Sequence, residues 1–239
     1  MQPVAEGVAG LTERLVSFRF PGGIRVDADR FGVVASSLRH AVMQRVPDPL
    51  PPEVSGHGAQ DRPHVAYLPL PDVGHAHARG DITGVAVLCP ADRTDLGRVI
   101  HRALTSSPAF ELQFSGASLR LRAESEVGST ARALVGPART WATTAPLVLD
   151  RFPGKGNEGA EIRRACVRSG FPEPDEVGTA SDSFLRGGIR LRRNDFPRRE
   201  QPPRPFCHVR LRFPEPVHGP VLLGAQRYFG MGLFIPADT

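Results

Sequence analysis

The amino-acid sequence predicts an α+β fold made of two consecutive units, and three observations lead to this prediction. Apolar patterns of strand and helix type follow one another in the order βαββαβ over the first half of the chain. A similar but incomplete series follows in the second half, and a glycine-rich segment precedes the last apolar run. The order βαββαβ is that of a ferredoxin-like, or RRM-like, unit. We therefore expect tandem ferredoxin-like units, the second one degenerate, with a C-terminal glycine-rich loop.

The first unit is predicted within residues 1–124. Its helices are expected at 29–46 and 95–106, where apolar residues recur at helical spacing, and Pro47 ends the first of them. Its strands are expected at 15–20, 64–71, 82–89 and 110–122, the last being one strand or a hairpin. A loop rich in proline and glycine lies between the first helix and the second strand.

The second unit is predicted within residues 125–239 and is less regular. One helix is expected at 158–169, where Gly170 stops it. The glycine-rich loop stands where a second helix would complete the repeat. The stretch 197–205, rich in arginine and proline, is expected to be an exposed loop. Strands are expected at 140–149, 184–192, 206–213 and 228–235.

The charge of the chain favours an acidic partner. Its net charge is +5 and its pI about 9.8, and Lys155 is the only lysine among 30 lysine and arginine residues. Arginine forks bind phosphates in a bidentate manner and stack on bases. A GC-rich genome would also favour arginine over lysine, but it does not account for the net charge. The excess of positive charge therefore favours an acidic partner, and the pI lies in the range typical of nucleic-acid binders.

The cysteines and the apolar runs place the chain among cytoplasmic proteins. Cys89, Cys166 and Cys207 lie far apart, without the spacing of a zinc site or a disulfide framework, and are expected to be small core residues. No apolar run approaches the roughly 20 residues of a membrane span. The N-terminal residues also lack the pattern of a secretory signal. We expect a cytoplasmic protein without a membrane partner.

Two predicted strands present arginines on one face. Side chains alternate along a strand, so His208, Arg210 and Arg212 lie opposite the apolar residues of their strand. A sheet with one apolar face and one arginine face suits an RNA backbone, although most charged strand faces are simply solvated. The arginines predicted to bind RNA on this face are Arg190, Arg192, Arg193, Arg210 and Arg212.

The glycine-rich segment near the C-terminus is the most distinctive feature of the chain. Glycine allows positive φ and close approach of another backbone, so main-chain N–H groups and Arg227 together suit a phosphate. The alternative is a tight hairpin before a final core strand. The residues predicted to contact RNA in this loop are Gly219, Gly224, Arg227, Gly230 and Gly232.

Histidines are the candidates for proton transfer near neutral pH. His57 lies in a Gly-His-Gly turn, which makes it accessible, and His40 lies on the first helix opposite its apolar stripe. His75 and His77 form a single His-x-His pair, which is weak evidence for a metal site. We predict neither a metal site nor a cofactor.

The combined motifs resemble one family of CRISPR proteins. The matching segments are 55–57, 64–71, 74–75, 80–84, 141, 144–150 and 208–232. They resemble the repeat-RNA endonuclease half of the fused Cas-five/Cas-six protein of type I-U (also called I-G) CRISPR systems, a Cas-six-like branch of the RAMP superfamily. The chain departs from that family in lacking the Cas-five-like part and in having Gln226 where a second glycine of the loop is usual.

The resemblance implies an endoribonuclease that cuts CRISPR repeat RNA without metal and yields a 2′,3′-cyclic phosphate. In such enzymes the general acid or base is often a histidine on or just after the first helix, which here means His57, the favoured candidate, or His40. The candidates for stabilising the charged transition state are Arg39, Arg62 and Lys155, the last also a predicted RNA contact. Implied partners are repeat RNA, the mature crRNA and other subunits of a type I complex.

Two other function classes stay open. The first is a RAMP subunit that binds the RNA in a surveillance complex without cutting it. A cleavage assay on a repeat hairpin in EDTA would separate this subunit from an endoribonuclease. A metal or small-molecule enzyme built on His75 and His77 would instead bind a stoichiometric metal ion.

Overall fold

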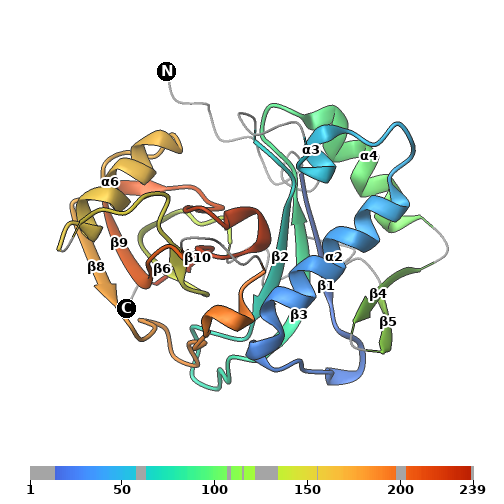
Figure 1. Ribbon diagram of the computed structural model, residues 1–239, viewed down its shortest axis with the longest axis horizontal. Helices are drawn as coiled ribbons and strands as arrows, with labels where there is room; N and C mark the ends of the chain where they lie inside the picture. The colour runs from blue at the N-terminus through green and yellow to red at the C-terminus, as the bar shows by residue number, and fades with distance from the viewer. Residues whose placement is uncertain are drawn as a thin grey trace.

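The computed structural model describes residues 14–57, 63–106, 109–114, 116–121, 134–154, 156–197 and 203–237. Figure 1 shows two halves side by side: an N-terminal half up to residue 121, coloured blue to green, and a C-terminal half from residue 134, coloured yellow to red. The predicted boundary between residues 124 and 125 lies outside the described residues. No helix in the described part of the chain is long and apolar enough to cross a membrane.

The N-terminal half contains a three-stranded antiparallel sheet in the order β1-β3-β2. Its strands are β1 (Leu15–Arg19), β2 (Ala66–Pro71) and β3 (Ile82–Leu88). The predicted strand or hairpin at 110–122 is a hairpin of β4 (Phe110–Phe114) and β5 (Ala117–Leu121). The element order thus follows the predicted βαββαβ series, but β4 pairs with β5 and, among the described residues, not with the three-stranded sheet.

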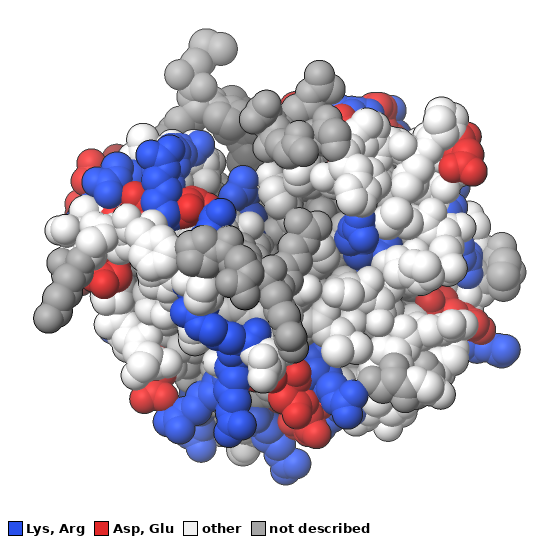
Figure 2. Space-filling model, in the orientation of Figure 1, with Lys and Arg blue, Asp and Glu red and all other residues white. Residues whose placement is uncertain are grey.

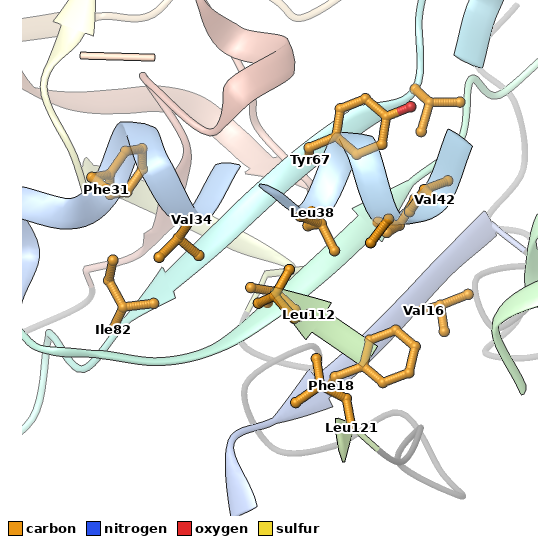
Figure 3. Packing of buried hydrophobic residues seen from close by; sticks show 14 of the residues in the cluster. Val16, Phe18, Phe31, Val34, Leu38, Val42, Tyr67, Ile82, Leu112 and Leu121 are labelled. Carbon is orange, nitrogen blue, oxygen red and sulfur yellow. The ribbon is translucent and has the colours of Figure 1, made fainter. Parts of the chain in front are cut away.

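Two long helices cover one face of this sheet. They are α2 (Phe31–Arg45) and α4 (Thr94–Thr105), and a short helix, α3 (Pro52–Ser55), follows the first. The short 3-10 turns η1 (Pro21–Gly23) and η2 (Ala28–Arg30) lead into α2. Figure 3 shows the apolar face of α2 pointing at the sheet and at the β4–β5 hairpin. The buried side chains labelled there are Val16, Phe18, Phe31, Val34, Leu38, Val42, Tyr67, Ile82, Leu112 and Leu121.

The C-terminal half is built around β9 (Phe206–Val217), the longest strand. This strand pairs with β6 (Ala138–Thr143), β7 (Leu147–Val148) and β8 (Glu176–Ala180), and β10 (Phe234–Pro236) adds to β6. The helix α6 (Glu158–Arg168) buries Ile162 and Cys166 in one cluster with Trp141, Val209 and Leu211.

Three strand predictions for this half are wrong in detail. Residues 184–192 form no strand: a turn closed by the Gly188 N–H on the Leu185 carbonyl begins the segment, and β8, which was not predicted, takes the place beside β9. The run 140–149 is divided into β6 and β7, since Pro146 has no N–H to donate to a ladder. The last strand begins at Phe234 and not at 228, because η4 (Arg227–Phe229) and two glycines at positive φ precede it.

The two halves share their apolar core. One face of the β1-β3-β2 sheet meets α2, while Leu68, Leu70 and Ala86 on the other face pack with Leu134 and Leu233 of the C-terminal half. A sheet buried on both faces has strands that are apolar throughout, which explains why every residue of β2 is buried. The junction between the halves therefore runs along β2, and the glycine-rich loop lies on the side of β2 that faces the C-terminal half (Figure 1).

Candidate functional site

A cleft of about 450 Å³ lies between the halves, and both contribute to its walls. We call it the central cleft. The N-terminal half supplies parts of α2, α3 and the start of β2, and the C-terminal half supplies the end of the β7 segment, the approach to β9 and the glycine-rich loop. Its polar lining consists of Arg39, Glu53, Ser55, His64, Tyr67, Asp150, Arg204, Gln226, Arg227 and Tyr228.

Glycines fix the shape of the loop that forms one wall. Gly232 has φ +68°, and a Cβ added there would lie 2.2 Å from the Leu223 carbonyl oxygen. Gly230 has φ +84°, and a Cβ there would lie 2.9 Å from Pro69 and 3.2 Å from Phe31 of the other half. A side chain at either position is therefore excluded by the backbone conformation and by the close neighbours. The loop consequently lies tightly on the N-terminal half and carries Arg227 into the cleft.

Arg227 is held in place by its own loop. Its Nη1 donates to the Gly224 carbonyl at 3.0 Å, and its Nη2 donates to the Tyr228 hydroxyl at 3.2 Å. The guanidinium lies 4.6 Å from the centroid of the Tyr228 ring, a cation–π distance. The Asp150 carboxylate is 3.9 Å from Nη1, so the cation is flanked by one carboxylate. A guanidinium carries five N–H donors, so the two donating atoms named here keep donors for a phosphate oxygen.

The opposite wall presents a second arginine and a histidine. The Arg39 guanidinium donates from Nη2 to the Ser55 carbonyl, which ties α2 to the end of α3. The His64 ring is half-buried, and its centroid lies 4.7 Å from that of Tyr228, so the two rings join the walls of the cleft. Tyr67 donates to the Val54 carbonyl at 2.7 Å, and burial raises the pKa of its phenol well above the ordinary value.

The two predicted catalytic histidines lie in different places. His57 is exposed directly after α3, next to Ser55 and Gly56 of the cleft wall, and its backbone N–H donates to Ser55 Oγ at 3.2 Å. His40 lines a separate hollow of about 350 Å³ between α2 and β4, where its Nε2 is 3.0 Å from Gln44 Nε2. The structure thus brings His57 to the edge of the central cleft and leaves His40 outside it.

The predicted arginine face is present on β9 in part. Arg210 and Arg212 are exposed, and Arg212 pairs with Glu176 of β8 at 2.9 Å. Arg190 pairs with Asp182 at 2.8 Å, and the Arg193 guanidinium lies 5.1 Å from the centroid of the Phe206 ring. The exposed arginines of the segment before β9 are Arg186, Arg190, Arg192 and Arg193. Figure 2 shows basic side chains gathered at the lower edge of the molecule, where Figure 1 draws this segment in orange.

His208 does not share the exposure of these arginines, which corrects the predicted face. It is 1% exposed, its Nε2 lies 3.0 Å from the Ile189 carbonyl, and its Nδ1 lies 3.1 Å from Thr143 Oγ1. A carbonyl can only accept, so Nε2 carries the proton and Nδ1 accepts from Thr143. Burial lowers the pKa of His208. The segment 184–192, which is not a strand, lies over this end of β9 and buries the imidazole.

The remaining predicted residues lie away from the central cleft or outside the described chain. Gly219 packs at the junction segment, where a Cβ would lie 2.1 Å from the Leu134 carbonyl oxygen. Lys155 and Arg62 lie outside the described residues. His75 Nε2 donates to Asp72 Oδ1 at 2.6 Å, and Asp72 also pairs with Arg25. Within the described ranges, no group of three or more His, Cys, Asp or Glu side chains could hold a metal ion.

Several cleft residues were missed by the sequence reasoning. No periodicity distinguishes these residues. Three of them precede or interrupt apolar runs, namely Glu53, His64 and Tyr228, and two flank loops, namely Asp150 and Arg204. The available signal was the family resemblance, whose segments include His64, Asp150 and Tyr228.

Comparisons with known proteins found similar solved structures and one matching family. Among solved structures, similar chains include a CRISPR associated protein Cas6, with 8% identity, a TM-score of 0.46, and coverage of 94% of this chain and 98% of that one. An RAMP protein binding different RNA substrates has 13% identity, a TM-score of 0.43 and coverage of 92% and 97%. Csf5, a CRISPR-Cas type IV Cas6 crRNA endonuclease, has 12% identity, a TM-score of 0.41 and coverage of 94% and 99%.

No curated protein matched this chain. The model of one protein family, the CRISPR-associated protein, GSU0054 family, matches residues 24–158 and 154–236. This match includes most of both halves of the fold, every polar residue of the central cleft and the glycine-rich loop. The chain therefore belongs to the GSU0054 family of CRISPR-associated proteins.

Proposed function

We propose that this protein binds CRISPR repeat RNA in the central cleft and cuts it as a metal-independent endoribonuclease. The observation that carries the proposal is the meeting of Arg39, His64, Arg204 and Arg227 in one cleft, in a chain that belongs to a CRISPR-associated family. Guanidinium groups bind phosphates through charge-assisted hydrogen bonds, and imidazole is the side chain that exchanges protons near neutral pH. Both functions are needed to cut a phosphodiester.

The proposed reaction is an attack of a ribose 2′-oxygen on the adjacent phosphorus. The new O2′–P bond forms while the P–O5′ bond breaks, which leaves a 2′,3′-cyclic phosphate and a 5′-hydroxyl. One proton leaves the 2′-hydroxyl and one reaches the departing 5′-oxygen, and a positioned acid or base typically contributes 10²–10⁴-fold to such steps. The charge that develops on the phosphate oxygens is stabilised by fixed cations, for which Arg39 and Arg227 are proposed.

We assign the two proton transfers to the histidines at the central cleft, His57 at its edge and His64 in its wall. His57 is exposed and follows Gly56, which has φ +68° at the end of α3, so its imidazole is accessible to a bound RNA. The His64 ring contacts the Tyr228 ring at a tilt of 50°, and the Arg227 guanidinium contacts the same Tyr228 ring. His40, in its separate hollow, is the matched control.

RNA beyond the cut site is proposed to follow the basic surface of the C-terminal half. Arg210 and Arg212 on β9 and the exposed arginines at 190–193 would contact phosphates. The protein is further proposed to act as the endonuclease half of a type I-U system and to stay bound to the mature crRNA with other type I subunits.

Single-turnover cleavage of a repeat hairpin in EDTA tests the assignment. Wild-type protein is expected to cut, whereas His57→Ala and His64→Ala should each lower the rate by at least about 10² with RNA affinity largely retained. His40→Ala should cut normally. If only His40→Ala abolishes cutting, the site lies in the hollow between α2 and β4. If wild-type protein binds the hairpin without cutting it, the chain is the non-catalytic RAMP subunit.

A further inference from the structure

One carboxylate of the central cleft is not accounted for by the proposed chemistry. Glu53, on the short helix α3, is 5% exposed and lines the cleft. Its Oε1 accepts a hydrogen bond from Arg93 Nη1, and Arg93 is held in turn by both carboxylate oxygens of Asp95 at 3.0 Å. Its Oε2 is buried and has no hydrogen-bond partner among the residues that the structure describes.

A buried carboxylate oxygen without a partner is unusual in a folded protein. Hydrogen bonds to charged groups are strong, and leaving such an atom desolvated and unpaired costs free energy that the rest of the fold must offset. Glu161 of α6 is the contrasting case, since it is 3% exposed but both of its oxygens are bound, one by Arg164 and one by Arg168. The open acceptor of Glu53 therefore marks a place in the cleft where a ligand can supply a donor.

We propose that Glu53 Oε2 accepts a hydrogen bond from a neutral donor of the nucleotide in the central cleft, and so decides which nucleotide fits. The donor would be the exocyclic amino group of a base or a ribose 2′-hydroxyl, both of which present an N–H or O–H to such an acceptor. This inference rests on the proposed function, because it requires RNA in the cleft.

The charges of the cleft favour this orientation of a nucleotide. A carboxylate repels a phosphate, so a phosphate is disfavoured next to Glu53, while the guanidinium groups of Arg39, Arg204 and Arg227 attract it. A nucleotide between the walls would thus turn its phosphate toward the arginines and its base or sugar edge toward Glu53. Arg93 holds Oε1 of the carboxylate by its hydrogen bond, which leaves Oε2 as the acceptor for the ligand.

The test is the Glu53→Gln variant combined with RNAs that each lack one donor. Arg93 can only donate, so the new amide should turn its oxygen toward Arg93 and its NH₂ toward the cleft, where an acceptor is replaced by a donor. Binding is measured in a His57→Ala background, in which cutting is expected to be at least about 10² slower. The RNA set contains single 2′-deoxy substitutions and single bases without the amino group, such as inosine for guanosine.

We expect one donor-lacking RNA to bind the Glu53 protein roughly tenfold or more weaker than the complete RNA, as for a hydrogen bond to a charged group. The Glu53→Gln protein should bind the complete RNA more weakly by a similar factor. It should also no longer distinguish the complete RNA from the donor-lacking RNA. If the RNA that binds weakly is a 2′-deoxy RNA, the donor is a ribose hydroxyl. If it is an RNA with an amino-lacking base, the donor is the amino group of that base. Glu161→Gln is the control and should leave every ratio unchanged.

The inference is overturned if Glu53→Gln folds and shows the same ratios as the Glu53 protein for every RNA. Should Glu53→Gln fail to fold, Glu53→Asp keeps the charge but withdraws the oxygen by one methylene, and an unchanged set of ratios would overturn the inference equally. Failure of the proposed function looks different, because Arg39→Ala and Arg227→Ala would then bind RNA like wild-type protein. If those arginine variants bind weakly while Glu53→Gln changes nothing, only the role of Glu53 is wrong.

Discussion

Replacing Gly232 with alanine is a direct test of how the glycine-rich loop is held. Gly232 has φ +68°, a region that costs an L-residue roughly 1–2 kcal/mol. The added Cβ would also lie 2.2 Å from the Leu223 carbonyl oxygen, far inside contact distance. To relieve that overlap the loop must move, which strains two backbone hydrogen bonds: Leu223 N–H to Gly232 O at 3.1 Å and Gly232 N–H to Pro146 O at 3.0 Å.

The magnitude follows from these contacts. Two hydrogen bonds contribute about 1 kcal/mol each, so the total cost of Gly232→Ala is about 3–4 kcal/mol. For a chain of 150–250 residues, each kcal/mol lowers the Tm by about 2–4 °C, so the expected decrease is at least about 6 °C. RNA affinity should decrease as well, because the displaced loop carries Arg227.

Gly170→Ala separates the conformational cost from the steric one. Gly170 has φ +84°, but a Cβ there would meet nothing within 4 Å, so only the cost of positive φ is expected, roughly 1–2 kcal/mol. Thermal unfolding followed by circular dichroism compares the two variants. If Gly232→Ala is no less stable than Gly170→Ala, and binds RNA like wild-type protein, the close packing of the loop is not what fixes the cleft wall.

Two further predictions concern His208 and the arginines of β9. Burial keeps the pKa of His208 below its unfolded value of 6.5, so the unfolded chain binds a proton first and His208 should lower stability as the pH falls through about 6.5. In Tm measurements between pH 5 and 8, His208→Gln should weaken this dependence, and an unchanged slope would mean that other groups cause it. Replacing Arg210 and Arg212 with alanine should reduce the slope of log affinity against log salt by up to about one per lost contact, whereas Arg120→Ala in the other half should not. An unchanged slope would show that the β9 arginines are only solvated.

Much of the secondary structure could be predicted from the sequence, because burial on one side of an element leaves a local period. The predicted helix at 29–46 is α2, Phe31–Arg45, and the predicted helix at 158–169 is α6, Glu158–Arg168. In both, apolar residues recur at helical spacing, and Pro47 or Gly170 stands where the pattern stops. Strands β2 and β3 were found for a related reason, since a sheet buried on both faces is apolar throughout.

The segment 184–192 shows where local pattern misleads. Ile189 and Leu191 alternate with Arg190 and Arg192, and the burial follows that alternation, with the apolar pair inside and the arginines exposed. The backbone is nevertheless not paired in a ladder there, because β8 already occupies the edge of β9. Alternation reports which side chains are buried, and it does not report whether the backbone has a neighbouring strand. The same limit hid β8, whose residues are mostly half-exposed and include Gly178.

The sequence by itself determined the helices and most strands, the basic charge and the glycine-rich loop, because each of these depends on residues close together in the chain. Only the tertiary structure decided the composition of the central cleft, which joins Arg39 and His64 to Arg227 and separates them from His40. It also decided that His208 is buried while Arg210, two residues later on the same side of the strand, is exposed. The physical reason is that exposure and proximity depend on which distant segment packs over a given face, and no period within the sequence records that choice.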